Sequence, residues 1–276
     1  MKTDIHVAHS PDSDDAFMFY ALASGKVGDD GFNYIHQLTD IETLNQRAFE
    51  GQYEVSAISF HAYAYVADKY VLMPCGASMG RNYGPIVVSR SPMTPDELTG
   101  GVVAVPGVLT TALLALRLFA PAVRYEPIPF DRILDDVQRG VYEAGLLIHE
   151  GQLTYREMGL HKVVDLGEWW IARTGLPLPL GGNVVRRDLG RDAIQRICKD
   201  VQASIRYGLE HREEAVQYAM QFARGLDVAR ADRFIGMYVN DLTLDYGEEG
   251  REAVRRLLAD AQTAGLIPKK VALEFA

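Results

Sequence analysis

Short apolar runs alternate with amphipathic stretches along the first part of the chain. Unbroken apolar runs indicate buried strands, and apolar positions that recur every three to four residues indicate helices. The pattern predicts strands at 5–8, 32–37, 55–59, 70–74 and 85–89 and helices at 14–25, 41–50 and 61–68. Because strands that alternate with helices are typical of crossover units, we expect a mostly parallel α/β sheet.

A Gly-rich stretch at 76–80 interrupts this alternation. We interpret it as a hairpin loop between the strands at 70–74 and 85–89. The alternation then restarts, with strands at 102–105, 124–128 and 144–148 and helices at 110–119 and 130–139. Beyond residue 188 the pattern predicts only helices, at 190–208, 211–224, 229–239 and 249–265.

The restart predicts two α/β lobes with a cleft between them. Lobe one is expected to comprise residues 1–88 and 181–276, including the C-terminal helices, and lobe two residues 89–180. The Pro- and Gly-rich segment 176–182 is the expected return crossing. Clefts between lobes are common ligand sites, so this two-lobed binding-protein architecture predicts a small molecule as the partner.

Composition narrows the classes of protein that fit. The 276 residues include 28 Lys and Arg against 37 Asp and Glu, a formal net charge of −9. This acidic balance argues against a nucleic-acid partner, which needs clustered basic side chains. No signal-peptide stretch follows Met1 and no apolar run approaches about 18 residues, which disfavours secretion and membrane insertion. Two cysteines, Cys75 and Cys198, are too few for a disulfide framework, so we expect a cytoplasmic protein.

Polar residues gather where predicted strands end, the edge at which open α/β sheets bind ligands. The loop from His9 to Asp15 follows the first strand, and Ser59 ends the third. Thr110 and Thr111 open the apolar helix of lobe two, and a helix N-terminus favours anions, so we predict a substrate carboxylate there. Simple helix capping is the alternative at each position, because Ser, Thr and Asp are preferred N-cap residues.

A histidine, His149, follows another apolar run. Neutral imidazole at a strand end can act as a general base near pH 7, and a hydrogen-bonded core histidine is the alternative. The letters G-x-S-x-G around Ser78 match a nucleophile elbow, but no helix can start at the residues that follow, so we reject a serine hydrolase. H-E-x-x-H, C-x-x-C and phosphate-binding glycine motifs do not occur in the sequence, so the motifs give little support for a metal ion or a nucleotide cofactor.

Motifs spread over nearly the whole chain are together specific for one family. The sequence resembles the 1,4-dihydroxy-6-naphthoate synthases of the futalosine route to menaquinone. The resemblance is carried by SPDSDDAF at 10–17, DIETLN at 40–45, VPGVLTTA at 105–112, IHEGQLTY at 148–155, VDLG at 164–167 with Trp169 and Trp170, and RTGLPLPLG at 173–181.

This resemblance implies a periplasmic-binding-protein-like fold of type II and a cytoplasmic lyase that works without metal or organic cofactor. The family converts cyclic dehypoxanthine futalosine to 1,4-dihydroxy-6-naphthoate and releases dihydroxyacetone. Some relatives carry a lysine where Ala57 stands, so the role of that side chain does not carry over to Ala57, whereas a backbone contact would survive the difference. His149 matches the family's proton acceptor. The family's substrate contacts match Ala57, Ile58, Ser59, Thr110 and Thr111.

Two other functions fit the same fold. One is chorismate dehydratase, a sister enzyme of the pathway, but the run from Ile148 to Glu150 followed by Thr154 and Tyr155 favours the synthase. The other is a cytoplasmic carboxylate-binding protein without catalytic activity, which has no need for a base at a strand end. A regulatory ligand-binding module is disfavoured because no helix-turn-helix precedes the first strand. The sequence leaves the oligomeric state open.

Overall fold

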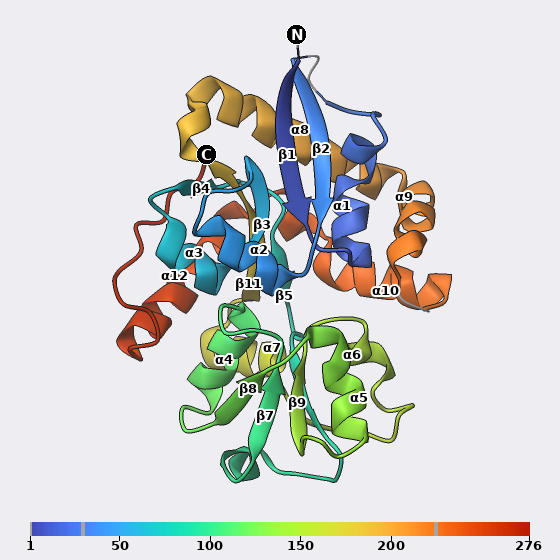
Figure 1. The fold of residues 1–276 in the computed structure, drawn as a ribbon, viewed down its shortest axis with the longest axis vertical. Coiled ribbons are helices and arrows are strands. Elements are labelled where there is room, and N and C mark those ends of the chain that lie inside the picture. Colours follow the sequence, from blue (N-terminus) through green and yellow to red (C-terminus); the bar gives the residue numbers. More distant parts are fainter. Residues whose placement is uncertain (1, 29–30, 224–225) are drawn as a thin grey trace.

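The strands of the computed structural model form two sheets, one above the other along the long axis of the molecule (Figure 1). The structure describes residues 2–28, 31–223 and 226–276. The first sheet has the strand order β2-β1-β3-β11-β4, and β5 pairs with β11 beside this path. Its strands are β1 (Thr3–His9), β2 (Phe32–Leu38), β3 (Val55–Ser59), β4 (Tyr70–Leu72), β5 (Ser78–Gly80) and β11 (Leu178–Arg186).

The second sheet has the strand order β10-β6-β9-β7-β8. Strand β7 is parallel to β8 and β9, whereas β6 is antiparallel to β9 and β10. Its strands are β6 (Ile86–Ser89), β7 (Val102–Val105), β8 (Arg124–Pro127), β9 (Ala144–Leu147) and β10 (His161–Asp165). We call the first sheet with its helices lobe one and the second sheet with its helices lobe two.

Two α/β sheets built from one chain confirm the predicted two-lobed fold, but the prediction of mostly parallel sheets is wrong. Strand β11 is antiparallel to β3, β4 and β5, and β6 is antiparallel to both of its neighbours. Both strands begin beside the junction of the two lobes, because each follows a crossing of the chain. They therefore run away from the junction, whereas β1, β3, β7 and β9 run toward it.

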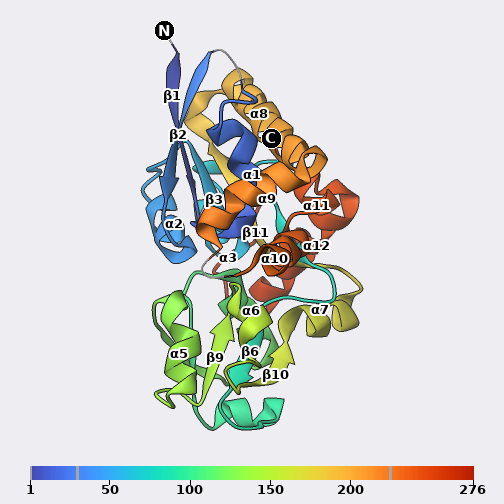
Figure 2. The same ribbon diagram turned by 90° about the vertical axis from the view of Figure 1, so that its right-hand side faces the viewer.

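Helices cover both sheets, and the C-terminal ones pack on lobe one (Figures 1 and 2). The packing partners of α1 are α8, α9 and α10, and α12 lies against α3, α4 and β11. Arg224, which ends one expected helix, and Met1 lie outside the described residues. The helices are α1 (Ser13–Ala23), α2 (Ile41–Ala48), α3 (Phe60–Val66), α4 (Thr111–Phe119), α5 (Ile133–Gln138), α6 (Gly151–Thr154), α7 (Leu166–Thr174), α8 (Arg191–Glu210), α9 (Arg212–Ala219), α10 (Val228–Tyr238), α11 (Asp241–Leu244) and α12 (Gly247–Thr263).

The hairpin interpretation of 76–80 is wrong. Strands β4 and β6 on either side of it belong to different sheets, and residues 78–80 form β5, which pairs with β11. The Gly-rich segment therefore belongs to the first crossing between the lobes rather than to a turn within one sheet. The backbone oxygen of Tyr83 lies against Gly80 and Gly167 so closely that a Cβ at either glycine would overlap it. These glycines permit the close backbone packing that the crossing requires.

One hydrophobic core spans both lobes. It joins Ile58 and Tyr63 of lobe one to Leu114 and Trp170 of lobe two, all fully buried. Trp170 is in this core, whereas Trp169 is only partly buried. A separate core lies between α1 and the C-terminal helices. The lobes are thus joined by packed side chains on one side of the junction.

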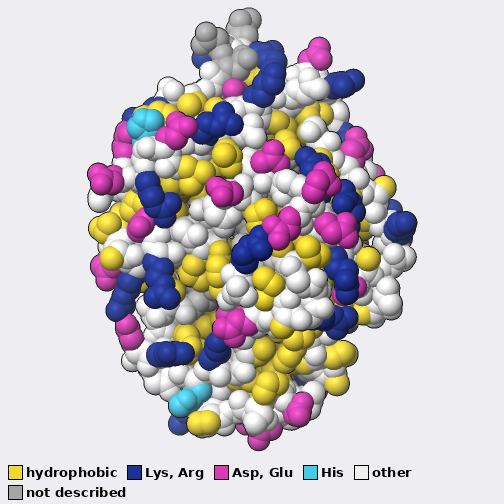
Figure 3. Space-filling view, turned by 180° about the vertical axis from the view of Figure 1, so that it is seen from behind, with side chains coloured by type: hydrophobic (Ala, Val, Ile, Leu, Met, Phe, Trp, Pro, Cys, Tyr) yellow, Lys and Arg dark blue, Asp and Glu magenta, His cyan; other side chains and the backbone are white. Residues whose placement is uncertain are grey.

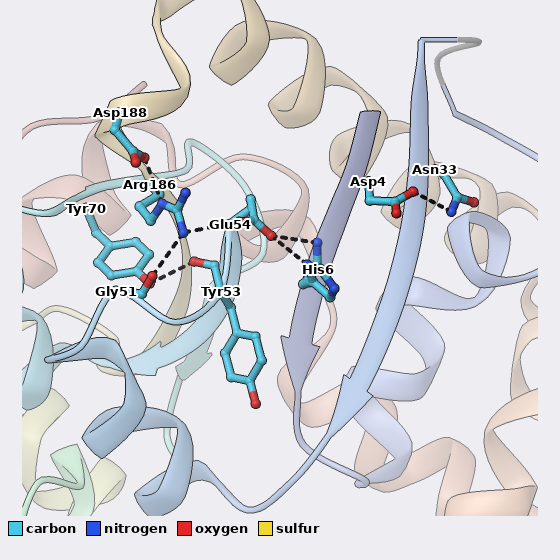
Figure 4. Close-up of polar contacts among 9 residues, drawn as sticks. All are labelled: Asp4, His6, Asn33, Gly51, Tyr53, Glu54, Tyr70, Arg186 and Asp188. Atoms are coloured by element: carbon cyan, nitrogen blue, oxygen red, sulfur yellow. Dashed lines mark hydrogen bonds and ion pairs between the residues drawn. The ribbon is translucent and has the colours of Figure 1, made fainter. Parts of the chain in front are cut away.

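A polar network fixes the far end of the first sheet (Figure 4). Glu54, just before β3, accepts hydrogen bonds from the backbone N–H and ring Nδ1 of His6 in β1, both at 2.9 Å. The other oxygen of Glu54 lies 3.1 Å from Nη1 of Arg186. Nε of the same arginine donates to Oδ1 of Asp188 at 2.7 Å. Because β1 and β3 share only two paired positions, these contacts help to hold their register.

The surface mixes charges of both signs. On the face drawn in Figure 3, basic and acidic side chains lie interspersed with apolar ones. Within the described ranges, every helix is too short or too polar to cross a lipid bilayer. Both cysteines are free and buried.

Candidate active site

A cavity of about 130 Å³ lies where the two lobes meet. It is lined by strand ends and helix starts of both lobes, the location predicted for ligand binding in such sheets. Of the five residues predicted to contact substrate, all five line this cavity. The lining includes Ser10, Asp12, Asp14, Asp15, Ala57, Ile58, Ser59, Ser78, Thr110, Thr111, Ala112, Ile148, Gln152, Gly181, Gly182, Asn183 and Tyr238.

The end of β3 is held by a buried asparagine. Asn45 of α2 donates from Nδ2 to Oγ of Ser59 at 3.0 Å and accepts from the Ser59 N–H through Oδ1 at 2.9 Å. Ser59 precedes α3 but its side chain makes no capping bond, so the capping alternative is wrong at this position. Sequence reasoning assigned no role to Asn45. Its complete burial shows that this amide fixes Ser59 at the cavity wall.

The start of α4 uses both threonine hydroxyls within the protein. Oγ1 of Thr110 accepts from the Leu113 N–H at 3.2 Å and donates to the carbonyl oxygen of Gly107 at 3.0 Å. The capping interpretation of Thr110 is therefore confirmed. Oγ1 of Thr111 accepts from the backbone N–H of His61, in α3 of lobe one, at 3.2 Å. Thr111 thus bonds across the junction while it lines the cavity.

A carboxylate of the protein occupies part of the predicted anion site. Glu42 of α2 accepts from the backbone N–H groups of Val108 and Leu109, each at 3.1 Å, in the loop that precedes α4. Burial raises the pKa of Glu42, and these two N–H groups offset part of the rise. Sequence reasoning missed this role, because the partners lie 66 residues apart. The N–H groups left for a ligand are those of the first turn of α4.

His149 lies beside the cavity rather than in its wall. It follows β9, and its neighbours Ile148 and Gln152 line the cavity. Nδ1 accepts a hydrogen bond from the Gly151 N–H at 3.0 Å, and the ring packs edge-to-face on Phe130 with centroids 5.6 Å apart. An acceptor at Nδ1 means that the neutral ring carries its proton on Nε2. The side chain is buried, with 9% of the residue exposed.

Several carboxyl groups lie where α1 of lobe one meets α6 of lobe two, on the other side of the junction from α2 and α4 (Figure 1). Asp15 accepts from the Ser10 N–H at 2.7 Å, and Asp12 from the Ser10 hydroxyl at 2.9 Å. Burial raises the pKa of Asp14 well above its usual range, and the charges of Asp15, Asp12 and Glu150 raise it further. Burial also raises the pKa of Asp15, to about 6.

Hydrogen bonds link the lobes at this acidic edge as well. Oγ of Ser13 donates to Oε1 of Glu150 at 3.3 Å, and the Tyr238 hydroxyl donates to Oε1 of Gln152 at 2.8 Å. Among the described residues that line the cavity, none is Lys or Arg. An anionic ligand would therefore rely on hydroxyls, amides and backbone N–H groups. Within the described ranges, no three His, Cys, Asp or Glu side chains are grouped so that they could hold a metal ion.

Two further histidines near the strand ends, His9 and His61, do not line the cavity. Nε2 of His9 lies 3.1 Å from Nδ1 of His36, and burial, followed by the charge of His36, lowers the pKa of His9 to about 3. Burial likewise lowers the pKa of His61 to about 4. Ser78 lines the cavity from β5, and the next element is β6 rather than a helix, which confirms that no nucleophile elbow forms there.

Comparison with known proteins identifies the family. The family model described as menaquinone biosynthesis matches residues 5–263. The chain is 44% identical over 262 residues to a Thermus thermophilus protein named 1,4-dihydroxy-6-naphthoate synthase, with 95% of each chain covered. A crystal structure of an Archaeoglobus fulgidus protein is 48% identical, with a TM-score of 0.92 over 96% of this chain and 98% of that one.

More distant structures show the fold alone. The alkanesulfonate-binding protein SsuA of Xanthomonas axonopodis is 11% identical, with a TM-score of 0.75 over the full length of both chains. This likeness confirms the expected periplasmic-binding-protein-like fold. Both the match to the family model and the identity to the Thermus relative extend over nearly the whole chain. The chain therefore belongs to the menaquinone biosynthesis family.

Proposed function

We propose that this protein is the lyase that converts cyclic dehypoxanthine futalosine to 1,4-dihydroxy-6-naphthoate and dihydroxyacetone, with His149 as the proton acceptor. The observation that carries the proposal is the meeting of two distant segments, 57–59 and 110–111, at one cavity beside His149. We infer the reaction from family membership, and the cavity between the lobes is the site at which we place it. The acidic composition and free, buried thiols suit the cytoplasm, where the proposal locates the enzyme.

The charges around the cavity support one orientation of the substrate. The carboxylate binds at the first turn of α4, where backbone N–H groups and the positive end of the helix favour an anion. The sugar-derived part lies at the acidic edge, because hydroxyl groups donate to the carboxylates of Asp12 and Asp15. The reverse orientation would place the substrate carboxylate against Asp12, Asp14 and Asp15, whose carboxyl groups disfavour a further negative charge.

Catalysis requires a rearrangement around His149. Its Nδ1 is engaged by the Gly151 N–H, so the neutral ring takes up a proton only when this bond is released. The cavity has a volume of about 130 Å³, close to the ~150 Å³ that accommodates a single benzene ring. It is therefore too small for a bicyclic substrate with a sugar-derived part. We therefore propose that the two lobes separate to admit substrate. Release of Nδ1 takes a separate, local change at the start of α6, because Gly151 belongs to the same lobe as His149, and closure of the lobes then excludes water.

The reaction itself needs little more from the protein. Breaking the carbon–carbon bond of the substrate expels the sugar-derived fragment, and the remaining ring system becomes aromatic, which provides the driving force. The protein must position the substrate, accept one proton and keep water out. General-base catalysis of this kind contributes about 10²–10⁴-fold to a rate.

The test is a mass-spectrometric assay of the purified protein with cyclic dehypoxanthine futalosine. We expect 1,4-dihydroxy-6-naphthoate and dihydroxyacetone in equal amounts, and no turnover of chorismate or of uncyclised dehypoxanthine futalosine. Consumption of chorismate instead would identify a chorismate dehydratase. Binding of the cyclic substrate without conversion, measured by calorimetry, would identify a binding protein and overturn the proposal.

A further inference from the structure

Glu42 is the point at which lobe one reaches into the loop before α4 of lobe two. Helix α2 packs on β3 of the first sheet, and its first turn faces the start of α4 across the junction (Figure 1). The Glu42 carboxylate accepts from the N–H groups of Val108 and Leu109, each at 3.1 Å. The side chain is partly buried, so water screens these bonds less than it would on an open surface.

The loop is shaped to admit this carboxylate. A Cβ at Gly107 would lie 2.7 Å from Cγ of Glu42 and would overlap its carboxyl group. Gly107 is not in the left-handed region of φ, so another residue could adopt its backbone conformation. Glycine at this position therefore leaves space for the Glu42 carboxyl group rather than supplying a special backbone conformation, and a larger residue would displace that side chain. Gly107 and Glu42 are thus matched to each other across the junction.

The same loop carries the residues that contact substrate in the proposed function. Thr110 bonds the Gly107 carbonyl and caps α4, so the position of Gly107 sets the position of the first turn. Residues 110–112 line the cavity. We propose that Glu42 is a positioning residue that fixes the loop 107–110 when the lobes close and so forms the binding surface for the substrate carboxylate.

An alternative role for Glu42 makes the opposite prediction. If Glu42 merely occupied the anion site in place of the substrate carboxylate, its removal would free two N–H donors and tighten substrate binding. If it positions the loop, its removal loosens the loop and weakens binding. The sign of the change in KM therefore separates the two roles. This kinetic comparison rests on the proposed function, whereas the exchange experiment below does not.

The first experiment measures amide hydrogen exchange in a peptide that spans residues 106–111, together with kinetics. In Glu42→Ala we expect exchange at Val108 and Leu109 to accelerate at least about tenfold, because both lose an acceptor. KM should rise about tenfold, with kcat within about threefold of wild type, as expected for lost uniform binding. Glu42→Gln keeps one acceptor oxygen, so its exchange rate and its KM should lie between those of wild type and those of Glu42→Ala. Glu50→Gln, an exposed carboxylate just beyond the same helix, is the matched control and should change neither quantity.

The second experiment is a double-mutant cycle with Gly107→Ala. In wild type this substitution should displace Glu42 and reproduce the faster exchange and raised KM. In the Glu42→Ala background the added methyl group meets no carboxyl group, so Gly107→Ala should change KM by less than about twofold. Additive effects in the cycle would contradict a direct match between the two residues.

The outcomes separate the inference from the proposed function. Unchanged exchange at 106–111 in Glu42→Ala, or a lower KM, would overturn the positioning role whatever the enzyme makes. Accelerated exchange in a protein that does not convert the cyclic substrate would uphold the loop contact and reject the proposed reaction. A fall in melting temperature with unchanged exchange and KM at 25 °C would show a structural role only.

Discussion

The two edges of the cavity use buried carboxyl groups in opposite ways. At the α4 edge a single carboxylate, that of Glu42, meets two backbone N–H donors and joins the lobes. At the α1 edge Asp12, Asp14, Asp15 and Glu150 crowd one another, and burial and mutual repulsion raise the pKa of Asp14 well above its usual range. The surrounding donors and charges, rather than the residue type, thus decide whether a carboxyl group fixes structure or holds a proton.

This contrast assigns different tasks to the two edges. The α4 edge offers fixed donors and a helix N-terminus, which suit the binding of an anion. The α1 edge holds titratable groups with shifted pKa values next to His149, which is typical of sites where protons move. The predictions below test this division by changing one edge at a time.

The largest effect is expected at the proton-transfer edge. His149→Asn removes the base but keeps a polar side chain of similar size, so turnover should fall by at least about 10²-fold. KM should change little, because the α4 edge remains intact. Steady-state kinetics with cyclic dehypoxanthine futalosine measure both quantities, and His161→Asn, an exposed histidine of β10, is the control.

Near-normal turnover in His149→Asn would place the proton acceptor elsewhere. His9 and His61 are poor substitutes, because burial lowers the pKa of His9 to about 3 and that of His61 to about 4, which makes both weak bases. Such a result would point instead to a carboxyl group of the acidic edge, and it would remove the main support for His149 in the proposed mechanism.

The next largest effect concerns stability rather than rate. Ionising Asp14 in the folded protein is costly, because burial and neighbouring charges favour its protonated form. The contribution of Asp14 to the free energy of unfolding is fully present below pH 3.8, the pKa of this group in the unfolded chain. It is lost as the pH rises toward the higher pKa of the folded protein. Asp14→Asn should therefore stabilise the protein at pH 7.

The gain in Asp14→Asn should grow as the pH rises above 3.8, by at most about 1.4 kcal/mol per pH unit for a single proton. Urea unfolding at several pH values measures this slope. Asp131→Asn, on an exposed position of lobe two, should show no such trend. A loss of stability in Asp14→Asn at pH 7 would mean that its carboxylate is stabilised where it lies, and the contrast between the two edges would fail.

The sequence predicted much of the fold that positions these two edges of the cavity. Strands β3 and β7 begin and end at the predicted residues, because β7 is an unbroken apolar run and β3 consists of small and apolar residues that are all buried. Strand β10 was missed, because its first residues, His161 and Lys162, are exposed at the edge of the second sheet. The short β5 was missed because its hydrogen bonds to β11 form only after the chain has crossed to lobe two and returned.

The site was predicted less completely, for a similar reason. The residues that line the cavity from strand ends follow local rules, so Ser59, Thr110 and Thr111 could be named from their positions. Asn45 and Glu42 act through partners far away in the sequence, and nothing in α2 itself shows that two of its polar side chains are directed at the cavity wall and the other lobe. Pairings of this kind become visible only in three dimensions.

A smaller effect is expected from the cap of α4. Thr110→Val removes the hydroxyl that accepts from the Leu113 N–H and donates to the Gly107 carbonyl. Losing an N-cap of this kind costs about 1 kcal/mol, and KM should rise because the first turn of α4 is less well held. Thr110→Ser should restore both the unfolding free energy and KM. Unchanged KM in Thr110→Val would remove the substrate carboxylate from this edge.

The smallest effect is expected from an ion pair that also joins the lobes. Arg230 of α10 contacts Glu157, which follows α6, at 2.6 Å, but their side chains are 44% and 56% exposed. Water and salt screen such pairs strongly, so Arg230→Gln should change KM by less than about twofold. The comparison with Glu42→Ala at equal ionic strength isolates the effect of burial, since both contacts cross the same junction. A rise in KM as large as that expected for Glu42→Ala would show that lobe closure, rather than the position of the α4 loop, controls substrate binding.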